Sequence, residues 1–208
     1  MTEKTILYRG AEAEIRLARY MGFRVVQKRR IPKSYRIKNI DDRLISMRTR
    51  EEAKLMTEAR IHGVSVPIIY DVDLEKGIIT MEYLKGKRIK DILNNLSEKE
   101  RMCICNKIGE SIARFHNNDI IHGDITTSNM ILLDDRVHFI DFGLGEKNSE
   151  MEAKGVDLHV LMEAIESTHS RYAKCFDYVL DGYRKEFKGD VGLVVKKIEE
   201  IVKRGRYR

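Results

Sequence analysis

The chain has 208 residues, of which 42% are hydrophobic and 35% are charged, with fourteen glycines and two prolines. This composition excludes disordered, collagen-like and low-complexity proteins, and no apolar run approaches the roughly 18 residues that would span a bilayer. The three cysteines, Cys103, Cys105 and Cys175, cannot all pair with one another, and the N-terminus lacks the apolar stretch of a signal peptide. We therefore expect a reduced, soluble, cytoplasmic protein that does not associate with membranes.

The net charge of +6 is unevenly distributed along the chain. Residues 24–50 contain ten Lys and Arg but only two Asp, and residues 203–208 add four further positive charges. The remaining residues sum to −6. Such concentrated basicity indicates a local anionic partner, with a solvated charged surface as the alternative.

The first part of the chain, up to about Tyr83, shows mainly strand patterns around a single helical segment. The expected elements are a hairpin of strands at 5–9 and 12–18 that turns at Gly10, a strand at 23–28, a helix at 41–63, and a second hairpin at 67–72 and 78–83. Asp41 and Asp42 suit the first turn of that helix, and Gly63 suits its C-terminal cap.

Beyond Leu84 the chain is mainly helical. Helices are expected at 90–96, 98–116, about 151–167, 170–187 and 190–204, with Ser97 capping the second of them. An irregular stretch with two small strands interrupts this series. The pattern predicts an α+β protein, in which residues 1–83 form a small antiparallel sheet with one helix and residues 84–208 form a helical lobe, with a hinge near residues 82–86.

Chemically distinctive residues fall in the irregular stretch. His122, Gly123 and Asp124 follow two isoleucines, Asn129 comes five residues after Asp124, and the DFG of residues 141–143 follows a short expected hairpin. Asp, Asn and Asp at strand ends supply the oxygen ligands that a magnesium–phosphate complex needs. HGDxxxxN, then a hairpin, then DFG matches the signature set of protein kinases.

That resemblance implies a role for each side chain. Asp124 would orient the nucleophile and accept its proton, while Asn129 and Asp141 would hold Mg²⁺ ions that bridge the phosphates of ATP. His122 is expected to hydrogen-bond and pack the loop rather than to transfer protons. A kinase-like site of this type, in a cleft between two lobes, also requires a phosphate-anchoring lysine.

Lys28 stands where the third strand of a kinase presents that lysine, directly after Val25-Val26-Gln27. On the helix that follows, Glu52 falls near the centre of the apolar stripe, whereas Glu51 and Glu58 lie well off it. A carboxylate on a buried face is costly unless it is paired. The sequence therefore predicts a Lys28–Glu52 pair, with an unpaired surface Glu52 as the alternative.

The expected nucleotide contacts depart in part from the kinase pattern. The phosphate-covering loop has one glycine, Gly10, where protein kinases have G-x-G-x-x-G, so it is shorter and less adaptable. The segment Met81-Glu82-Tyr83-Leu84 is expected to pair with adenine through backbone groups, with Met81 as gatekeeper. ATP is thus expected to contact Gly10, Lys28, Met81, Glu82, Leu84, Asn129 and Asp141.

Further segments resemble one family over nearly the whole chain. They are KRRIPKSYR at 28–36, RTREEA at 48–53, HGDITTSN at 122–129, KGVDL at 154–158 and KRGRYR at 203–208. Together they resemble the small atypical kinase subunit of the KEOPS complex, a relative of the RIO kinases. The resemblance implies an ATP-dependent kinase or ATPase that supports threonylcarbamoyladenosine formation in tRNA, with the threonylcarbamoyl-transferase subunit and a small regulatory subunit as partners.

The sequence also lacks parts of a typical protein kinase. Gly123 replaces the arginine of HRD, only ten residues separate DFG from KGVDL, and no APE motif follows. Thr126 stands where serine/threonine kinases place a lysine near the transferred phosphate, and losing that cation weakens transfer to a peptide. Transfer to water, or to a serine of the chain itself, is therefore expected over broad protein kinase activity.

Two other functions fit parts of the sequence. Small-molecule kinases of the aminoglycoside-phosphotransferase type also carry HGDxxxxN, but they build their substrate pocket from a large helical insertion, for which this chain has little room. A scaffold with a vestigial site is disfavoured because all five expected polar residues are present.

The basic segments are expected to contact tRNA phosphates or an acidic protein face, without reading bases. The candidate contacts are Arg29, Arg30, Lys33, Arg36, Lys38, Lys203, Arg204 and Arg206.

Overall fold

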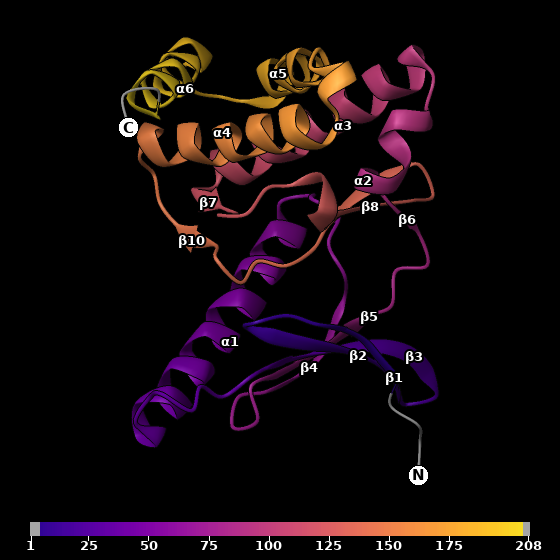
Figure 1. The fold of residues 1–208 in the computed structure, drawn as a ribbon, viewed down its shortest axis with the longest axis vertical. Helices are drawn as coiled ribbons and strands as arrows, with labels where there is room; N and C mark the ends of the chain where they lie inside the picture. Colours follow the sequence, from indigo (N-terminus) through magenta and orange to yellow (C-terminus); the bar gives the residue numbers. More distant parts are fainter. Residues whose placement is uncertain (1–4, 206–208) are drawn as a thin grey trace. The chain divides into compact units, whose positions relative to one another are not determined.

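The structure, a computed structural model, describes residues 5–205 (Figure 1). They form two compact units. The first consists of the described residues up to Thr57 and of Pro67–Lys85, and the second of Glu58–Val66 and the described residues from Gly86 onward. The division differs from the expected one at residues 58–66, which the sequence pattern assigned to the first lobe.

The first unit is an antiparallel sheet of five strands in the order β1-β2-β3-β5-β4, with one long helix. Its elements are β1 (Thr5–Arg9), β2 (Ala13–Tyr20), β3 (Phe23–Arg30), α1 (Lys38–Ile61), β4 (Ile69–Asp73) and β5 (Ile78–Glu82). Both predicted hairpins and the third strand are present. Helix α1 begins three residues before the expected Asp41, which is buried and accepts a hydrogen bond from the Lys33 backbone N–H (2.9 Å).

The end of α1 has the capping geometry that the sequence predicts. Gly63 has a φ of +78°, its N–H bonds the Arg60 carbonyl, and the Val64 N–H reaches back to Ala59 (both 3.0 Å). This pair of bonds is a Schellman motif, which satisfies carbonyls that the last helical turn leaves free. A side chain at Gly63 would strain the left-handed backbone, so the glycine sets where α1 stops.

The second unit combines five short strands with five helices. Its elements are β6 (Lys87–Arg88), α2 (Ile89–Ile92) with a 3₁₀ turn (Leu93–Asn95), α3 (Glu98–Asn117), β7 (Ile120–Ile121), a 3₁₀ turn η2 (Thr127–Asn129), β8 (Met130–Leu133), β9 (Arg136–Phe139), β10 (Glu146–Lys147), α4 (Met151–Thr168), a 3₁₀ turn (Ser170–Tyr172), α5 (Cys175–Glu186) and α6 (Val191–Gly205). The strands form a three-stranded sheet, β6-β8-β9, and a β10-β7 pair.

Local signals predict some helix boundaries in this unit and miss others. Ser97 caps α3 in a full capping box, because its hydroxyl accepts from the Glu100 N–H (3.3 Å) while Glu100 accepts from the Ser97 N–H (2.8 Å). The helix expected over 90–96 is only one α-helical turn and a 3₁₀ turn, and the one expected from residue 170 begins at Cys175.

The core of the second unit surrounds α3. Figure 1 shows α5 alongside α3 and α6 alongside α4, which agrees with the extensive contacts of both pairs. Phe115 of α3 meets the rings of Phe139 (5.0 Å) and Phe142 (5.6 Å) edge-on, and all three are fully buried. This aromatic cluster lies directly beneath the loop that carries the predicted chemistry. Within residues 5–205, no helix combines the length and apolar character needed to cross a bilayer.

Candidate active site

The predicted pair of Lys28 and Glu52 is present in the first unit. Lys28 lies on β3 and Glu52 on α1, and the Lys28 Nζ is 2.5 Å from Glu52 Oε1. Both side chains are almost completely buried. Burial of a charge is costly unless a partner compensates it, so the geometry explains why a carboxylate stands on the apolar stripe of α1.

Glu52 has a second cationic partner that the sequence did not indicate. The Arg30 Nη2 lies 2.6 Å from Glu52 Oε2, and Arg30 is buried. Residues 28 and 30 share one face of β3 because side chains alternate along a strand. Arg30, which was expected to contact tRNA or a protein partner, has a buried guanidinium that bonds Glu52. The spacing of two residues on a strand was the signal that could have revealed it.

In the first unit, some backbone N–H groups of the segments that are expected to contact the nucleotide already donate hydrogen bonds within the chain. The Gly10 N–H bonds the Ala13 carbonyl (3.0 Å), so this amide closes the β1–β2 turn. The Glu82 N–H bonds the Ile68 carbonyl (2.8 Å), so this amide is already engaged. Met81 and Leu84 are buried.

In the second unit, Asn129 fixes the loop that carries Asp124. The Asn129 Nδ2 donates to the Asp124 carbonyl (3.0 Å) and to Asp124 Oδ2 (2.8 Å). Neighbouring Ile125 and Met130 are fully buried and anchor the loop on both sides of η2. One carboxylate oxygen of Asp124 is thereby oriented, and the side-chain oxygen of Asn129 stays on the side away from these bonds.

His122 is a packing residue, as predicted. Its Nε2 lies 3.2 Å from the Ile140 carbonyl, and its Nδ1 lies 3.3 Å from the Asp124 N–H. Burial lowers the pKa of His122, so the ring is neutral, with Nε2 as donor and Nδ1 as acceptor. Its ring packs 4.5 Å from that of Phe142. His122 thus ties the Asp124 loop to the strand end that leads into Asp141.

Gly123 and Asp141 both adopt backbone conformations with positive φ. Gly123 has a φ of +79°, and a Cβ there would lie 2.2 Å from the Leu144 carbonyl oxygen. The arginine of HRD therefore cannot be accommodated here.

Asp141 has a φ of +65° and its Oδ1 accepts from the Gly143 N–H (3.2 Å), while its side chain is exposed. Asp tolerates this region better than most residues.

Asp157, which lies in the KGVDL segment, supports the loop that carries Asp124. It lies on α4, is buried, and accepts the backbone N–H groups of His122 and Gly123 (both 2.9 Å). Its Oδ2 also lies 3.4 Å from His116 Nε2, and His116 Nδ1 lies 2.9 Å from the Tyr183 hydroxyl. Burial opposes ionisation, but these hydrogen bonds keep the pKa of Asp157 below its usual value. An aspartate in an apolar helix was the available signal.

A second buried histidine supports the other end of the loop. His169, just after α4, lies 3.0 Å from the Thr127 hydroxyl through Nε2 and 2.7 Å from Asn94 Oδ1 through Nδ1. Burial lowers the pKa of His169, so Nδ1–H donates to Asn94 and Nε2 accepts from Thr127. Helix α4 therefore holds the loop through Asp157 and, at its C-terminal end, through His169.

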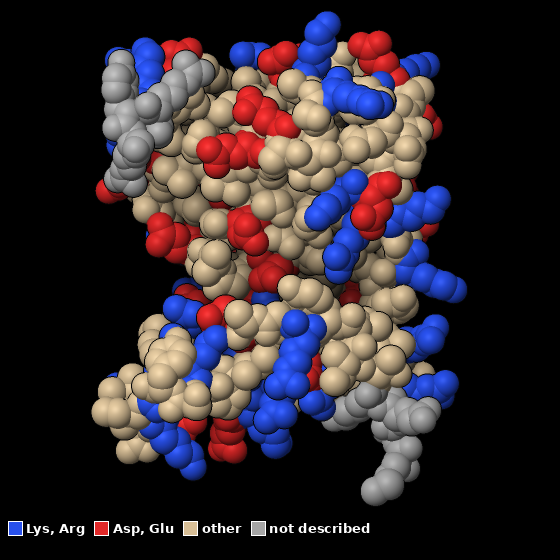
Figure 2. All heavy atoms as spheres, in the orientation of Figure 1, with Lys and Arg blue, Asp and Glu red and all other residues tan. Residues whose placement is uncertain are grey.

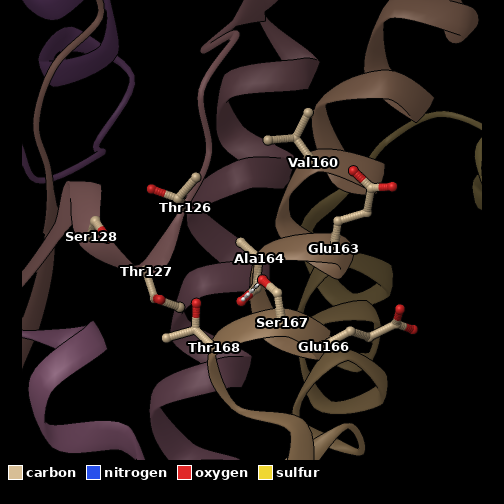
Figure 3. A pocket seen from close by; sticks show the side chains of 9 residues that line it. All are labelled: Thr126, Thr127, Ser128, Val160, Glu163, Ala164, Glu166, Ser167 and Thr168. Carbon is tan, nitrogen blue, oxygen red and sulfur yellow. Dashed lines mark hydrogen bonds between the residues drawn. The ribbon is translucent and has the colours of Figure 1, made fainter.

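A hollow of ≈ 780 Å³ adjoins this loop (Figure 3). Thr126, Thr127 and Ser128 line one side, and residues of the second half of α4, including Glu163 and Glu166, line the other. Its lining contains hydroxyls and carboxylates but neither Lys nor Arg. The surface beside Thr126 thus lacks the cation that serine/threonine kinases place there.

The basic segments differ in exposure. Figure 2 shows Lys and Arg side chains gathered over α1 and the strands of the first unit. Arg29, Lys38 and Lys203 are exposed, whereas Lys33 and Arg36 are partly buried. Arg204 bonds Glu152 (2.6 Å), and Arg206 lies outside the described residues.

Comparison with known proteins gives a family match. The model of the RIO domain matches residues 15–177. This chain belongs to the RIO domain family. The match supports a kinase-like α+β fold and kinase or ATPase activity in general, and it contains every predicted catalytic residue of both units.

Individual relatives extend the similarity to nearly the whole chain. The KEOPS complex subunit Bud32 of Pyrococcus abyssi is 44% identical over 98% of this chain and 96% of its own length. Probable bifunctional tRNA threonylcarbamoyladenosine biosynthesis proteins of Methanobrevibacter smithii and Methanothermobacter thermautotrophicus are 43% and 44% identical over 97% of this chain. The chain spans 36% of the length of these two proteins.

The donor set fits ATP with a divalent metal, as expected for the RIO domain family. No group of three or more His, Cys, Asp or Glu that could hold a metal alone occurs within residues 5–205. Mg²⁺ typically binds through one or two carboxylates plus substrate phosphates, not in an all-protein cage. The exposed Asp141 carboxylate and the Asn129 amide oxygen suit that mode of binding.

Proposed function

We propose that this RIO-family chain is the atypical kinase or ATPase subunit of a KEOPS-type assembly that supports threonylcarbamoyladenosine modification of tRNA. The observation that carries the proposal is the near end-to-end similarity to KEOPS subunit Bud32, combined with an intact set of Lys28, Glu52, Asp124, Asn129 and Asp141.

The catalytic residues divide the work of phosphoryl transfer. ATP with Mg²⁺ supplies the transferable phosphoryl group and neutralises its charge. Lys28 holds phosphate oxygens and is kept in place by Glu52, while Asn129 and Asp141 hold the metal. Asp124, whose carboxylate is oriented by Asn129 (2.8 Å), aligns the attacking hydroxyl or water and accepts its proton.

We further propose that the acceptor is water or a serine of this chain rather than a broad range of peptides. The hollow beside Thr126 offers no cation to the transferred phosphate, which disfavours tight docking of a phosphorylated peptide product. Chain autophosphorylation on serine would then accompany slow hydrolysis of ATP.

The proposed partners are a threonylcarbamoyl-transferase subunit, a small regulatory subunit and tRNA. The names of the relatives support membership of a tRNA-modifying assembly, because one is a subunit of the KEOPS complex and others are bifunctional tRNA threonylcarbamoyladenosine biosynthesis proteins. The exposed cations of the first unit supply the charge that tRNA would require.

The test measures Mg²⁺-dependent ATP hydrolysis by the chain alone, with the transferase subunit, and with tRNA. Asp124→Ala should reduce turnover at least about a hundredfold while folding persists, because general-base assistance contributes about that factor or more. Asp181→Ala removes an exposed carboxylate of α5 and should leave turnover unchanged. Full turnover by Asp124→Ala would refute the assignment.

The alternative, a small-molecule kinase of the aminoglycoside-phosphotransferase type, is tested in the same assay. Transfer to an aminoglycoside or a choline-like acceptor, without any response to tRNA or the transferase, would favour it. The RIO domain match and the KEOPS relative support the first function over this one.

A further inference from the structure

A small pocket in the first unit is lined mainly by cations. It lies where the β1–β2 turn, the segment after β3 and the first half of α1 meet, and its free volume of ≈ 10 Å³ is close to that of one water molecule. Its lining residues are Glu12, Arg30, Ile31, Lys33, Arg36, Leu44, Ile45 and Arg48. Four of these eight side chains are positive and one is negative.

Glu12 is the acidic side chain within this cationic wall. Its Oε1 lies 3.1 Å from Lys33 Nζ and its Oε2 lies 3.5 Å from Arg48 Nη1. The hydrogen bond from Lys33, with the charges of Lys33, Arg48 and Arg36, lowers the pKa of Glu12 against the opposing effect of burial. The Glu12 carboxylate is therefore held as an anion by three cations from two segments.

The charges of the pocket are incompletely balanced by the chain itself. Asp41 pairs with Arg36 (3.1 Å), whereas Arg30 shares Glu52 with Lys28 (2.6 and 2.5 Å). Glu12 supplies one negative charge to the other two cations, Lys33 and Arg48. A dianion in place of Glu12 would add one further negative charge beside these cations.

One donor of the pocket has no partner. Arg30 is 6% exposed, and its Nε is a buried nitrogen without a hydrogen-bond partner among the described residues. Buried N–H groups are nearly always satisfied, so an unsatisfied guanidinium nitrogen in a pocket wall indicates a missing acceptor. The Glu12 carboxylate bonds Lys33 and Arg48 instead.

Glu12 can leave without disturbing the fold. Its side chain is 56% exposed, and it lies in the turn between β1 and β2. The turn is fixed independently by backbone bonds, from Ile31 N–H to the Glu12 carbonyl (3.0 Å) and from Gly10 N–H to the Ala13 carbonyl (3.0 Å). Rotation of the Glu12 side chain therefore requires no change in these backbone bonds.

We propose that this pocket binds a phosphate dianion, either free or as a monoester, in exchange for the Glu12 carboxylate. Lys33 and Arg48 bind its outer oxygens, and Arg30 Nε donates to it from the pocket floor while Arg30 Nη2 keeps its bond to Glu52. Arginine can bond Glu52 and a phosphate at the same time because its planar guanidinium presents several donors in fixed directions. The site is separate from the residues assigned to ATP, and it shares Arg30 with the carboxylate that holds Lys28.

The test is a titration of the isotope-labelled full chain with inorganic phosphate, followed by NMR of the backbone amides of residues 10–13 and 33. A saturating non-hydrolysable ATP analogue with Mg²⁺ occupies the nucleotide site throughout. Glu12→Gln should bind phosphate several-fold more tightly, because the competing charge is gone. Arg48→Ala should bind about tenfold more weakly, as expected for one lost charge-assisted hydrogen bond.

Arg43→Ala is the matched control, because Arg43 is exposed on α1 but does not line the pocket; its affinity should stay at the wild-type value. A phosphoserine peptide replaces inorganic phosphate in a second arm. Binding of both probes with the same dependence on Glu12 and Arg48 identifies a monoester site, and binding of inorganic phosphate alone identifies a site for the free ion. The proposal fails if Glu12→Gln brings no gain, if Arg43→Ala weakens binding as much as Arg48→Ala, or if only an RNA oligonucleotide shifts these amides.

Discussion

At the scale of single residues, Glu52 is a buried carboxylate with two cationic partners. Lys28 and Arg30 both bond Glu52, at 2.5 and 2.6 Å. Under the proposed function, Lys28 divides its hydrogen bonds between Glu52 and phosphate oxygens, and Arg30 continues to compensate the carboxylate. The second cation therefore lowers the cost of keeping Glu52 buried and charged.

Glu52→Gln tests this arrangement. An amide cannot balance two buried cations, so we expect the free energy of unfolding to fall by about 3 kcal/mol or more and ATP turnover to fall at least about tenfold. Urea denaturation and an ATPase assay measure the two effects. Glu51→Gln, one position along α1 and exposed, should change stability by less than about 0.5 kcal/mol. If both variants changed stability and turnover equally, the buried pairing of Glu52 would not be the cause of the effect.

His122 predicts a pH dependence of stability. Burial lowers its pKa in the folded chain below the ordinary 6.5, so the unfolded chain binds the extra proton more readily. Stability is then fully present above about pH 6.5 and declines as the pH falls below it, by up to about 1.4 kcal/mol per pH unit for this one group.

Denaturation curves at several pH values between about 7.5 and 5 measure the slope. In His122→Asn the slope should be shallower than in the wild type, whatever the absolute stability of the variant. His62→Asn, which removes an exposed histidine after α1, should keep the wild-type slope. Parallel curves for wild type and His122→Asn would contradict the stated cause.

At the scale of elements, α4 is the helix that holds the Asp124 loop. Its Asp157 accepts the N–H groups of His122 and Gly123 (both 2.9 Å), and His169 at its end bonds Thr127 (3.0 Å). The helix thus bonds the loop at two separate places, through Asp157 and through His169, and this limits how far the loop can shift. Positioning of Asp124 thus depends on an element that follows it in sequence by about thirty residues.

Asp157→Asn should separate positioning from chemistry. The amide has the shape of the carboxylate but offers one acceptor oxygen, so one of the two backbone N–H groups loses its partner. We expect a loss of about 1–3 kcal/mol in the free energy of unfolding and a fall in kcat with little change in the KM for ATP. Asp181→Asn, at an exposed position of α5 that does not line the hollow, serves as control. An unchanged kcat in Asp157→Asn would remove the positioning role.

The elements also show how far local sequence signals reach. The hairpins, the capping box of Ser97 and the Schellman motif at Gly63 are specified by neighbouring residues, and they are where the sequence predicts them. The start of α5 is not where the sequence predicts it. Residues 170–174 form a 3₁₀ turn and an irregular segment, although their apolar spacing resembles that of α5. Just before this segment, His169 bonds Thr127 and Asn94, which lie far from it in sequence and are invisible to a local pattern.

At the scale of the whole molecule, the positive charge is concentrated in the first unit and in the C-terminal segment. Exposed cations such as Arg29 and Lys38 are available to an anionic polymer, whereas Arg30 is enclosed. Polyanion binding of this type releases counterions, so its affinity depends steeply on salt.

Binding of tRNA by the full chain should therefore weaken with salt by roughly 0.7–0.9 log units per phosphate contact per decade. Arg29→Ala should reduce that slope by about one contact, measured by filter binding or anisotropy across a salt series. Arg184→Ala, an exposed arginine of α5, should leave the slope unchanged. A salt-independent interaction would point to a protein surface as the partner of the basic segment.

The sequence by itself determined the fold class, the order of most elements and the pairing of Lys28 with Glu52, and it predicts the roles of Asp124, Asn129 and Asp141. These follow from periodicity, local caps and motif spacing, which depend on residues close together in the chain. Only the tertiary structure decided that Arg30 shares Glu52, that Asp157 and His169 hold the catalytic loop, and that Glu12 lies among cations. Each of these is a polar contact between segments far apart in sequence, and a buried polar group is compensated by whichever partner the folded chain brings within hydrogen-bonding distance.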